Sequence, residues 1–237
     1  MLIRITNCCT MGCTHCLIEA SHNGAHMAFN TYLMALNFLR SLDAPVVFLS
    51  GGEPTENPNL LTFLSVANTM GLKVLLMSNG LFLANEELRE QVLPQVWGVQ
   101  VTNDPRFYPD TIKVFPHPKV KYENQIRQVA PFGRALTNKL LCNRLTPYCF
   151  NLRSCARSFG NVGQALAYLW GLGKFCTPSI NPDGTVVAGE ASSCHPIGTV
   201  WDSPETVTRN LCDMRCNRCG LVLNLDKLQQ EAIGEAP

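Results

Sequence analysis

The stretch CCTMGCTHC, from Cys8 to Cys16, gathers four cysteines within nine residues and decides how the chain is interpreted. It directly follows a short apolar run, LIRIT (2–6), which predicts a strand. Thiols this close together at the end of a strand fit three structures: a disulfide staple, a zinc site or an iron–sulfur cluster. The rest of the sequence has to distinguish among them.

The other cysteines argue against disulfides. The chain has 237 residues and 12 cysteines, and none lies between Cys16 and Cys142. A stapled fold would spread its bridges through the chain, whereas cysteine clusters in a reducing compartment more often bind metal or serve catalysis. The sequence has no signal peptide and no apolar run long enough to span a bilayer, so we expect a cytoplasmic protein. Its formal net charge of +1 gives no general attraction to nucleic acid or membranes.

The first hundred residues alternate between strand and helix patterns. Strands are predicted over 2–6, 45–50, 73–78 and 97–102, and helices over 30–42, 59–70 and 85–93, the first of them capped by Asn30 or Thr31. Continuous apolar strands between helices predict a parallel α/β sheet, whose chemistry lies at the carboxyl ends of the strands. Those ends carry CCTMGCTHC, SGGEP (50–54), SNG (78–80) and TND (102–104), so all four stretches are expected on one rim.

The second half has weaker patterns. Helices are predicted over 121–130 and 162–170, and a hairpin is predicted around Asp183-Gly184. Residues 124–182 contain no Asp or Glu but seven Lys or Arg residues. This basic stretch is either a solvated face or the wall of a pocket for anionic groups.

The spacing of Cys9, Cys13 and Cys16, C-x3-C-x2-C, suits a 4Fe–4S cluster with three protein ligands and one open iron. Structural zinc takes four protein ligands, and His15 is the alternative ligand for such a site. Cys8 is one residue out of register, and we interpret it as a spare or packed thiol.

At this point the sequence resembles the radical S-adenosylmethionine superfamily, whose signature is C-x3-C-x-(aromatic or His)-C after the first strand. SGGEP resembles the GGEP motif of that superfamily, which binds the amino group of the methionine moiety. Its glycines admit close backbone approach, and Glu53 can pair with an ammonium group. The resemblance implies that S-adenosylmethionine is bound by Gly51, Gly52, Glu53, Pro54, Ser78, Asn79, Thr102 and Asp104.

Gly133-Arg134-Ala135 resembles the GRA triplet of several such enzymes. Arg134 would then meet the S-adenosylmethionine carboxylate or position the substrate, and the alternative is a plain surface charge.

The resemblance also implies a fold and a reaction. The fold is a partial (β/α) TIM-like barrel, here over residues 1–170. The open iron chelates S-adenosylmethionine, and a reduced cluster cleaves it to methionine and a 5′-deoxyadenosyl radical, which abstracts a substrate hydrogen. Such an oxidoreductase or maturase needs an external one-electron donor, such as a flavodoxin- or ferredoxin-like protein.

Residues 171–237 are expected to form a small cysteine-rich lobe with four thiol ligands, suited to zinc or to a fully ligated 4Fe–4S cluster. The lobe resembles the twitch domain, a short form of SPASM, which implies an auxiliary 4Fe–4S cluster. Its expected ligands are Cys176, Cys194, Cys216 and Cys219, with Cys212 as a substitute. An auxiliary cluster that accepts an electron from a substrate radical gives net oxidation or cross-linking. Cys142, Cys149 and Cys155 are interpreted as packed thiols. The alternatives are a third cluster, or one of them as a proton or hydrogen-atom donor facing the radical.

Three functional hypotheses follow. The first is a radical enzyme that acts on a small metabolite or a peptide. The second keeps this chemistry but places it on a nucleic acid or nucleoside, which only the basic stretch supports. The third is a non-catalytic zinc-binding scaffold.

Overall fold

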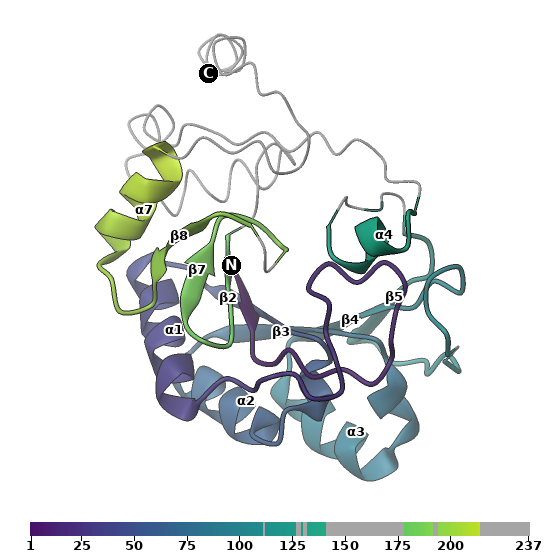
Figure 1. Cartoon of the computed structure of the whole chain (residues 1–237). Helices are drawn as coiled ribbons and strands as arrows, with labels where there is room; N and C mark the ends of the chain where they lie inside the picture. The colour runs from purple at the N-terminus through teal and green to yellow at the C-terminus, as the bar shows by residue number, and fades with distance from the viewer. Residues whose placement is uncertain (111, 127–128, 130–131, 141–177, 192–193, 214–237) are drawn as a thin grey trace, which may run out of the picture.

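The computed structural model describes residues 1–110, 112–126, 129, 132–140, 178–191 and 194–213. Within these residues, eight strands form one sheet in the order β5-β4-β3-β2-β1-β6-β7-β8 (Figure 1). Strands β1 to β6 are paired in parallel, and β7 and β8 continue the sheet antiparallel. Their bounds are β1 (Leu2–Arg4), β2 (Val46–Ser50), β3 (Lys73–Ser78), β4 (Gly98–Thr102), β5 (Val120–Glu123), β6 (Ser179–Ile180), β7 (Thr185–Val187) and β8 (Pro196–Thr199).

Three helices connect the first four strands and cover one side of the sheet (Figure 1). The described helices are α1 (Phe29–Ser41), α2 (Leu60–Thr69), α3 (Glu86–Val92), α4 (Arg134–Thr137) and α7 (Pro204–Asp213), with short 3-10 turns η1 (Pro54–Glu56), η2 (Leu81–Ala84) and η3 (Leu93–Gln95). The predicted alternation of strand and helix is therefore confirmed, and so is the partial barrel class. Among the described residues, no helix combines the length and hydrophobicity that a membrane span requires.

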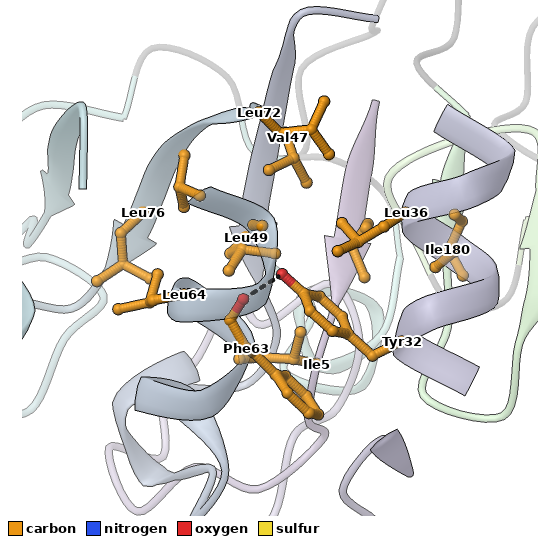
Figure 2. Packing of buried hydrophobic residues seen from close by; sticks show 14 of the residues in the cluster. Ile5, Tyr32, Leu36, Val47, Leu49, Phe63, Leu64, Leu72, Leu76 and Ile180 are labelled. Carbon is orange, nitrogen blue, oxygen red and sulfur yellow. Dashed lines mark hydrogen bonds between the residues drawn. The ribbon is translucent and has the colours of Figure 1, made fainter. Parts of the chain in front are cut away.

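The core lies between the helices and the outer face of the sheet (Figure 2). Successive strand residues point to opposite faces, so every second side chain of β2 and β3 meets the helices. These are Val47, Leu49, Val74 and Leu76, all fully buried. Tyr32 of α1 stacks on Phe63 of α2 with ring centroids 4.1 Å apart and donates its hydroxyl to the Phe63 carbonyl at 3.0 Å.

The opposite, inner face of the sheet is less tightly covered. Along β2 the burial alternates, so Val46, Phe48 and Ser50 are only half-buried while their neighbours are buried. The sheet thus packs its core on one side and leaves the other side open to a cavity.

Two predictions about elements are wrong. The described residues of the range 121–130 contain no helix, because the chain from Val120 to Glu123 is strand β5, paired in parallel with β4. Val120 and Tyr122 alternate with the exposed Lys121 and Glu123, which is the two-residue period of an edge strand. Helix α1 also begins one residue earlier than predicted.

The cap of α1 is Ala28, which offers no side-chain hydrogen bond, in place of Asn30 or Thr31. Phe29 and Tyr32 pack on Phe63, and this packing fixes the start of the helix without a polar cap.

The predicted hairpin at Asp183-Gly184 is confirmed. Strands β6 and β7 flank it, Gly184 adopts φ +85°, and Asp183 accepts a hydrogen bond from the Thr185 amide at 2.9 Å. The predicted helix at 162–170 and the boundary between 170 and 171 lie outside the described residues.

Candidate functional site

The cysteine loop follows β1 and lies over the carboxyl end of the sheet. Cys9, Cys13 and Cys16 all line one cavity of about 330 Å³. Gly12 between them has φ +67°, a left-handed conformation that favours glycine and lets the loop turn tightly. The Ala20 amide donates to the Cys16 sulfur at 3.4 Å.

Glu56, in the turn after GGEP, fixes the start of this loop. Its carboxylate accepts hydrogen bonds from the amide and the hydroxyl of Thr10 at 3.0 and 2.8 Å. The Cys8 thiol donates to the same carboxylate at 3.3 Å and to the His22 carbonyl at 3.2 Å. Cys8 therefore has hydrogen-bond partners within the protein, as expected of a packed thiol.

The two glycines of SGGEP bring the end of β2 against the end of β1. The Gly52 amide donates to the Thr6 carbonyl at 2.8 Å, and the Glu53 amide donates to the Cys8 carbonyl at 2.8 Å. A Cβ on Gly52 would lie 2.2 Å from the Cys8 carbonyl oxygen, so no larger residue fits there. Gly51 and Gly52 line the cavity, whereas Pro54 does not.

Glu53 does not line the cavity, and its side chain joins two strand ends. Its carboxylate accepts hydrogen bonds from the Ser78 hydroxyl at 2.9 Å, the Asn79 amide at 2.8 Å, and the amide and hydroxyl of Thr55 at 3.1 and 2.7 Å. The side chain is buried, and this burial raises the pKa of Glu53. Its expected pairing with an ammonium group stays a prediction, because these four donors already use the carboxylate.

The ends of the third and fourth strands reach the same cavity. Ser78, Asn79 and Thr102 line it, and the buried Asn79 side-chain nitrogen has no hydrogen-bond partner among the described residues. Asp104 does not line it. The Asp104 carboxylate instead accepts from the Arg106 guanidinium, with a shortest distance of 2.6 Å, and from the Ile126 amide at 2.7 Å.

Arg134 comes to the site from the start of α4. The Arg134 amide donates to the Cys16 carbonyl at 3.0 Å, and its guanidinium donates to the Ala20 carbonyl. Helix α4 accordingly lies beside the cysteine loop, which is purple in Figure 1. Arg134 lines the cavity and is thus at the site rather than on a remote surface.

Sequence reasoning did not assign several other residues that line the cavity. Signals for them existed: Arg4 is a charge within an apolar strand, and Gln100 is a polar residue in another. The remaining lining residues are Leu2, Met11, His15, Leu17, Ile18, Ala20, Phe48, Ser50, Met77, Tyr108 and Glu190. His15 lies 4.9 Å from Phe107 and 5.3 Å from Tyr108, measured between ring centroids.

The three cysteines fit an iron–sulfur cluster. Burial raises the pKa of Cys9 to about 11 and that of Cys13 to about 12, so these thiolates need a positive group beside them to form at neutral pH. Across the described part of the chain, no three His, Cys, Asp or Glu side chains converge as a single metal ion requires. The three thiols line the same cavity, and the amide directed at the Cys16 sulfur would stabilise a thiolate.

Of the four expected auxiliary ligands, only Cys194 lies in the described part of the chain, half-buried after β7. The substitute ligand Cys212 lies in helix α7. Cys176, Cys216 and Cys219 lie outside the described residues, as do Cys142, Cys149 and Cys155. The auxiliary cluster therefore stays a prediction. Most of the basic stretch 124–182 is likewise outside them.

Comparison with known proteins places this site in context. No protein-family model matches the sequence. The PqqA peptide cyclase of Bradyrhizobium diazoefficiens is 27% identical over 104 residues, which are 43% of this chain and 27% of the cyclase. The crystal structure of BtrN in complex with AdoMet and 2-DOIA matches 99% of this chain and 86% of its own, with a TM-score of 0.57 and 13% identity.

The chain therefore has the fold of BtrN. An open conformation of BtrN matches as well, over 99% of this chain and 85% of that one, with a TM-score of 0.53 and 13% identity. In this fold the cysteine loop lies at the carboxyl end of β1 and lines the cavity. The match to the cyclase spans about a quarter of that protein's length.

Proposed function

We propose that the protein is a radical S-adenosylmethionine enzyme that oxidises or cross-links a peptide or a small metabolite. One observation carries this proposal: Cys9, Cys13 and Cys16 line the same cavity as the glycines of SGGEP and the ends of β3 and β4. A cluster and an organic cofactor held in that cavity would lie next to each other. The likeness to a peptide cyclase supports a peptide substrate, and the likeness to BtrN with 2-DOIA supports a small one.

The residues of the cavity have distinct roles in this proposal. Cys9, Cys13 and Cys16 hold three irons of a 4Fe–4S cluster. When bound, this cluster and S-adenosylmethionine supply a 5′-deoxyadenosyl radical that removes a hydrogen atom from the substrate. The backbone of Gly51 and Gly52 admits the methionine moiety at close range.

Polar groups around the cavity orient the cofactor. Ser78, Asn79 and Thr102 offer hydrogen bonds to its ribose, and Arg134 offers a cation to its carboxylate. Glu53 acts indirectly, because its hydrogen bonds hold the ends of β2 and β3 in register. Apolar lining by Met11, Leu17 and Ile18 excludes water from the reacting atoms.

The proposal also covers the auxiliary cluster, the electron donor and the location of the enzyme in the cell. Cys176, Cys194, Cys216 and Cys219 hold an auxiliary 4Fe–4S cluster that accepts the substrate's electron. A flavodoxin- or ferredoxin-like protein donates the first electron. The enzyme works in the cytoplasm, where its many cysteines stay reduced.

The test is to purify and reconstitute the protein without oxygen and to count iron and sulfide per chain. The proposal expects about eight irons in the wild type, four for each cluster, and about four when Cys9, Cys13 and Cys16 are all changed to Ala. S-adenosylmethionine cleavage to 5′-deoxyadenosine should disappear in that variant. The matched control is Cys8→Ala, which removes a thiol from the same loop and should keep both iron and cleavage.

Two results would count against the proposal. A wild type that holds zinc and little iron would favour the zinc scaffold. Loss of iron in Cys8→Ala to the same extent as in the triple variant would mean that the loop, and not the three motif thiols, is required. Modification of a nucleic acid with a steep dependence on salt would replace the substrate class but keep the chemistry.

A further inference from the structure

The inner face of the sheet contains an unusual charge. Register pairs Leu2 with Phe48 and Arg4 with Ser50, so all four side chains share the face that lines the cavity. The residues of β3 and β4 that line the cavity carry no charge: Met77, Ser78, Gln100 and Thr102. Arg4 is thus the cation that strand β1 directs into the cavity.

Arg4 is deeply buried, with only 1% of its surface exposed. Its guanidinium donates to the Asn181 side-chain oxygen at 2.6 Å and to the Glu190 carbonyl. Both acceptors are uncharged, and they hold the guanidinium in one orientation from the hairpin segment that follows β6. A guanidinium has five N–H donors, so up to three remain for a further acceptor.

In the described part of the chain no carboxylate is in ion-pair contact with Arg4. Glu190 and Cys194 lie near enough to favour its charge, but burial has the larger effect. The described residues form two ion pairs, Arg89 with Glu86 and Arg106 with Asp104, and neither involves Arg4. Burial lowers the pKa of Arg4 to about 10, so the side chain still carries its charge at neutral pH. A buried cation with no counter-charge in direct contact is unfavourable, and a ligand that brings a negative group into contact with it would relieve this cost.

We infer that Arg4 binds a carboxylate of the substrate inside the cavity. The inference rests on the proposed function for what the substrate undergoes, and it adds the chemical group by which the substrate is recognised. A carboxylate matches the planar fork of the guanidinium. Glu190 also lines the cavity and repels a dianion more than a monoanion, which favours a carboxylate over a phosphate monoester.

The experiment is a calorimetric titration of the reconstituted protein, saturated with S-adenosylmethionine, with three probes. N-acetyl-glutamate methylamide carries one carboxylate, N-acetyl-glutamine methylamide is its neutral isostere, and ethyl phosphate is the phosphate probe. The inference expects the glutamate probe to bind about tenfold or more tightly than the glutamine probe. Equal binding of these two, or tighter binding of ethyl phosphate, would overturn it.

Variants locate the binding group. Arg4→Met should abolish the preference for the glutamate probe, whereas Arg40→Met, which removes an exposed arginine of α1, should retain it. A second pair of variants tests the same point with Arg4 left in place. Ser50→Asp places a carboxylate beside Arg4 and should abolish the preference, while the neutral, isosteric Ser50→Asn should keep it. A preference that survives both Arg4→Met and Ser50→Asp would overturn the inference.

The outcomes separate this inference from the proposed function. Formation of 5′-deoxyadenosine by the wild type, together with equal binding of the glutamate and glutamine probes, would leave the function standing and remove the role of Arg4. A clear preference for the glutamate probe without S-adenosylmethionine cleavage would support the role of Arg4 and remove the proposed function. A parallel titration without S-adenosylmethionine tests whether the cofactor occupies Arg4. If the preference for the glutamate probe is seen only without the cofactor, Arg4 serves the cofactor carboxylate instead, which also overturns the inference.

Discussion

At the scale of single residues, Glu53 determines whether the ends of β2 and β3 stay together. Its four hydrogen-bond donors require a carboxylate, and the amide of Glu53→Gln would direct an N–H group at one of them. We expect Glu53→Gln to lower the free energy of unfolding by about 1–3 kcal/mol, because a buried donor is left unpaired. Urea denaturation monitored by circular dichroism measures this loss.

The control for that measurement is Glu86→Gln. The Glu86 side chain is 78% exposed and lies 3.6 Å from Arg89, so its removal should cost about 0–1 kcal/mol. Equal losses in the two variants would show that Glu53 does not join the strand ends.

Asp104 gives a prediction about pH. Hydrogen bonds from Arg106 hold the pKa of Asp104 below its ordinary value. Because the folded-state pKa is depressed, this stabilisation is present above the unfolded value of about 3.9 and is lost as the pH falls below it. The difference in unfolding free energy between wild type and Asp104→Asn should therefore be largest near pH 7 and shrink toward pH 3.

Denaturation series at several pH values check this expectation. Asp43→Asn, at an exposed position after α1, is the matched control and should change stability little at any pH. A difference for Asp104→Asn that stays constant from pH 7 to 3 would contradict the prediction.

At the scale of elements, the contact between SGGEP and the cysteine loop sets the geometry of the site. In Gly52→Ala the new methyl group would meet the Cys8 backbone, which cannot move without displacing the loop. We expect iron content to fall and 5′-deoxyadenosine formation to drop on the order of 100-fold, because small displacements of reacting groups are costly. Iron analysis and product quantification by chromatography measure both effects.

Gly71→Ala separates this effect from general destabilisation. Gly71 ends the turn after α2 with φ +78° and has open space around its Cβ position, so alanine strains the backbone without touching the site. Its iron content should match the wild type. A parallel loss of iron in both variants would point to stability rather than to loop geometry.

The elements differ in how far the sequence could predict them. Strands β2 and β3 are continuous apolar runs between glycines and prolines, so both their positions and the rim of the site followed from the sequence. Strand β5 has only Val120 and Tyr122 on its core-facing side, and such an edge strand resembles one turn of a helix. Its secondary structure is determined by pairing with β4, and a local sequence pattern cannot predict that contact.

Site residues differ in the same way. Motif residues at strand ends, such as Gly52 and Ser78, could be placed on the rim because parallel strands end together. The inward direction of Glu190 could not, because it depends on how the segment after β7 folds back over β1. The interior role of Glu53 was also beyond sequence reasoning, since the same residue could face either the cofactor or the protein.

At the scale of the whole molecule, the sheet predicts where stability is greatest. Strands β2 and β3 lie in the middle of the sheet and pack on the helices, whereas β5 and β8 are its described edges. We expect the amides of Val47, Leu49 and Leu76 to exchange with deuterium last, at rates that follow global unfolding. Amides of β8 should exchange much earlier, as measured by mass spectrometry. Uniform exchange across the sheet would contradict this expectation.

Strand β1 pairs with β2 on one side and with β6 on the other, and β6 is synthesised much later on the ribosome. Arg4 bonds to Asn181, which lies 177 residues further along the chain. At about 5–20 residues per second, the free edge of β1 waits on the order of 10–35 s before β6 is made. During that interval the nascent sheet exposes an open edge to other chains. A strand of three residues that carries an arginine is a poor template for foreign pairing, so the cation in the cavity also protects the unfinished protein.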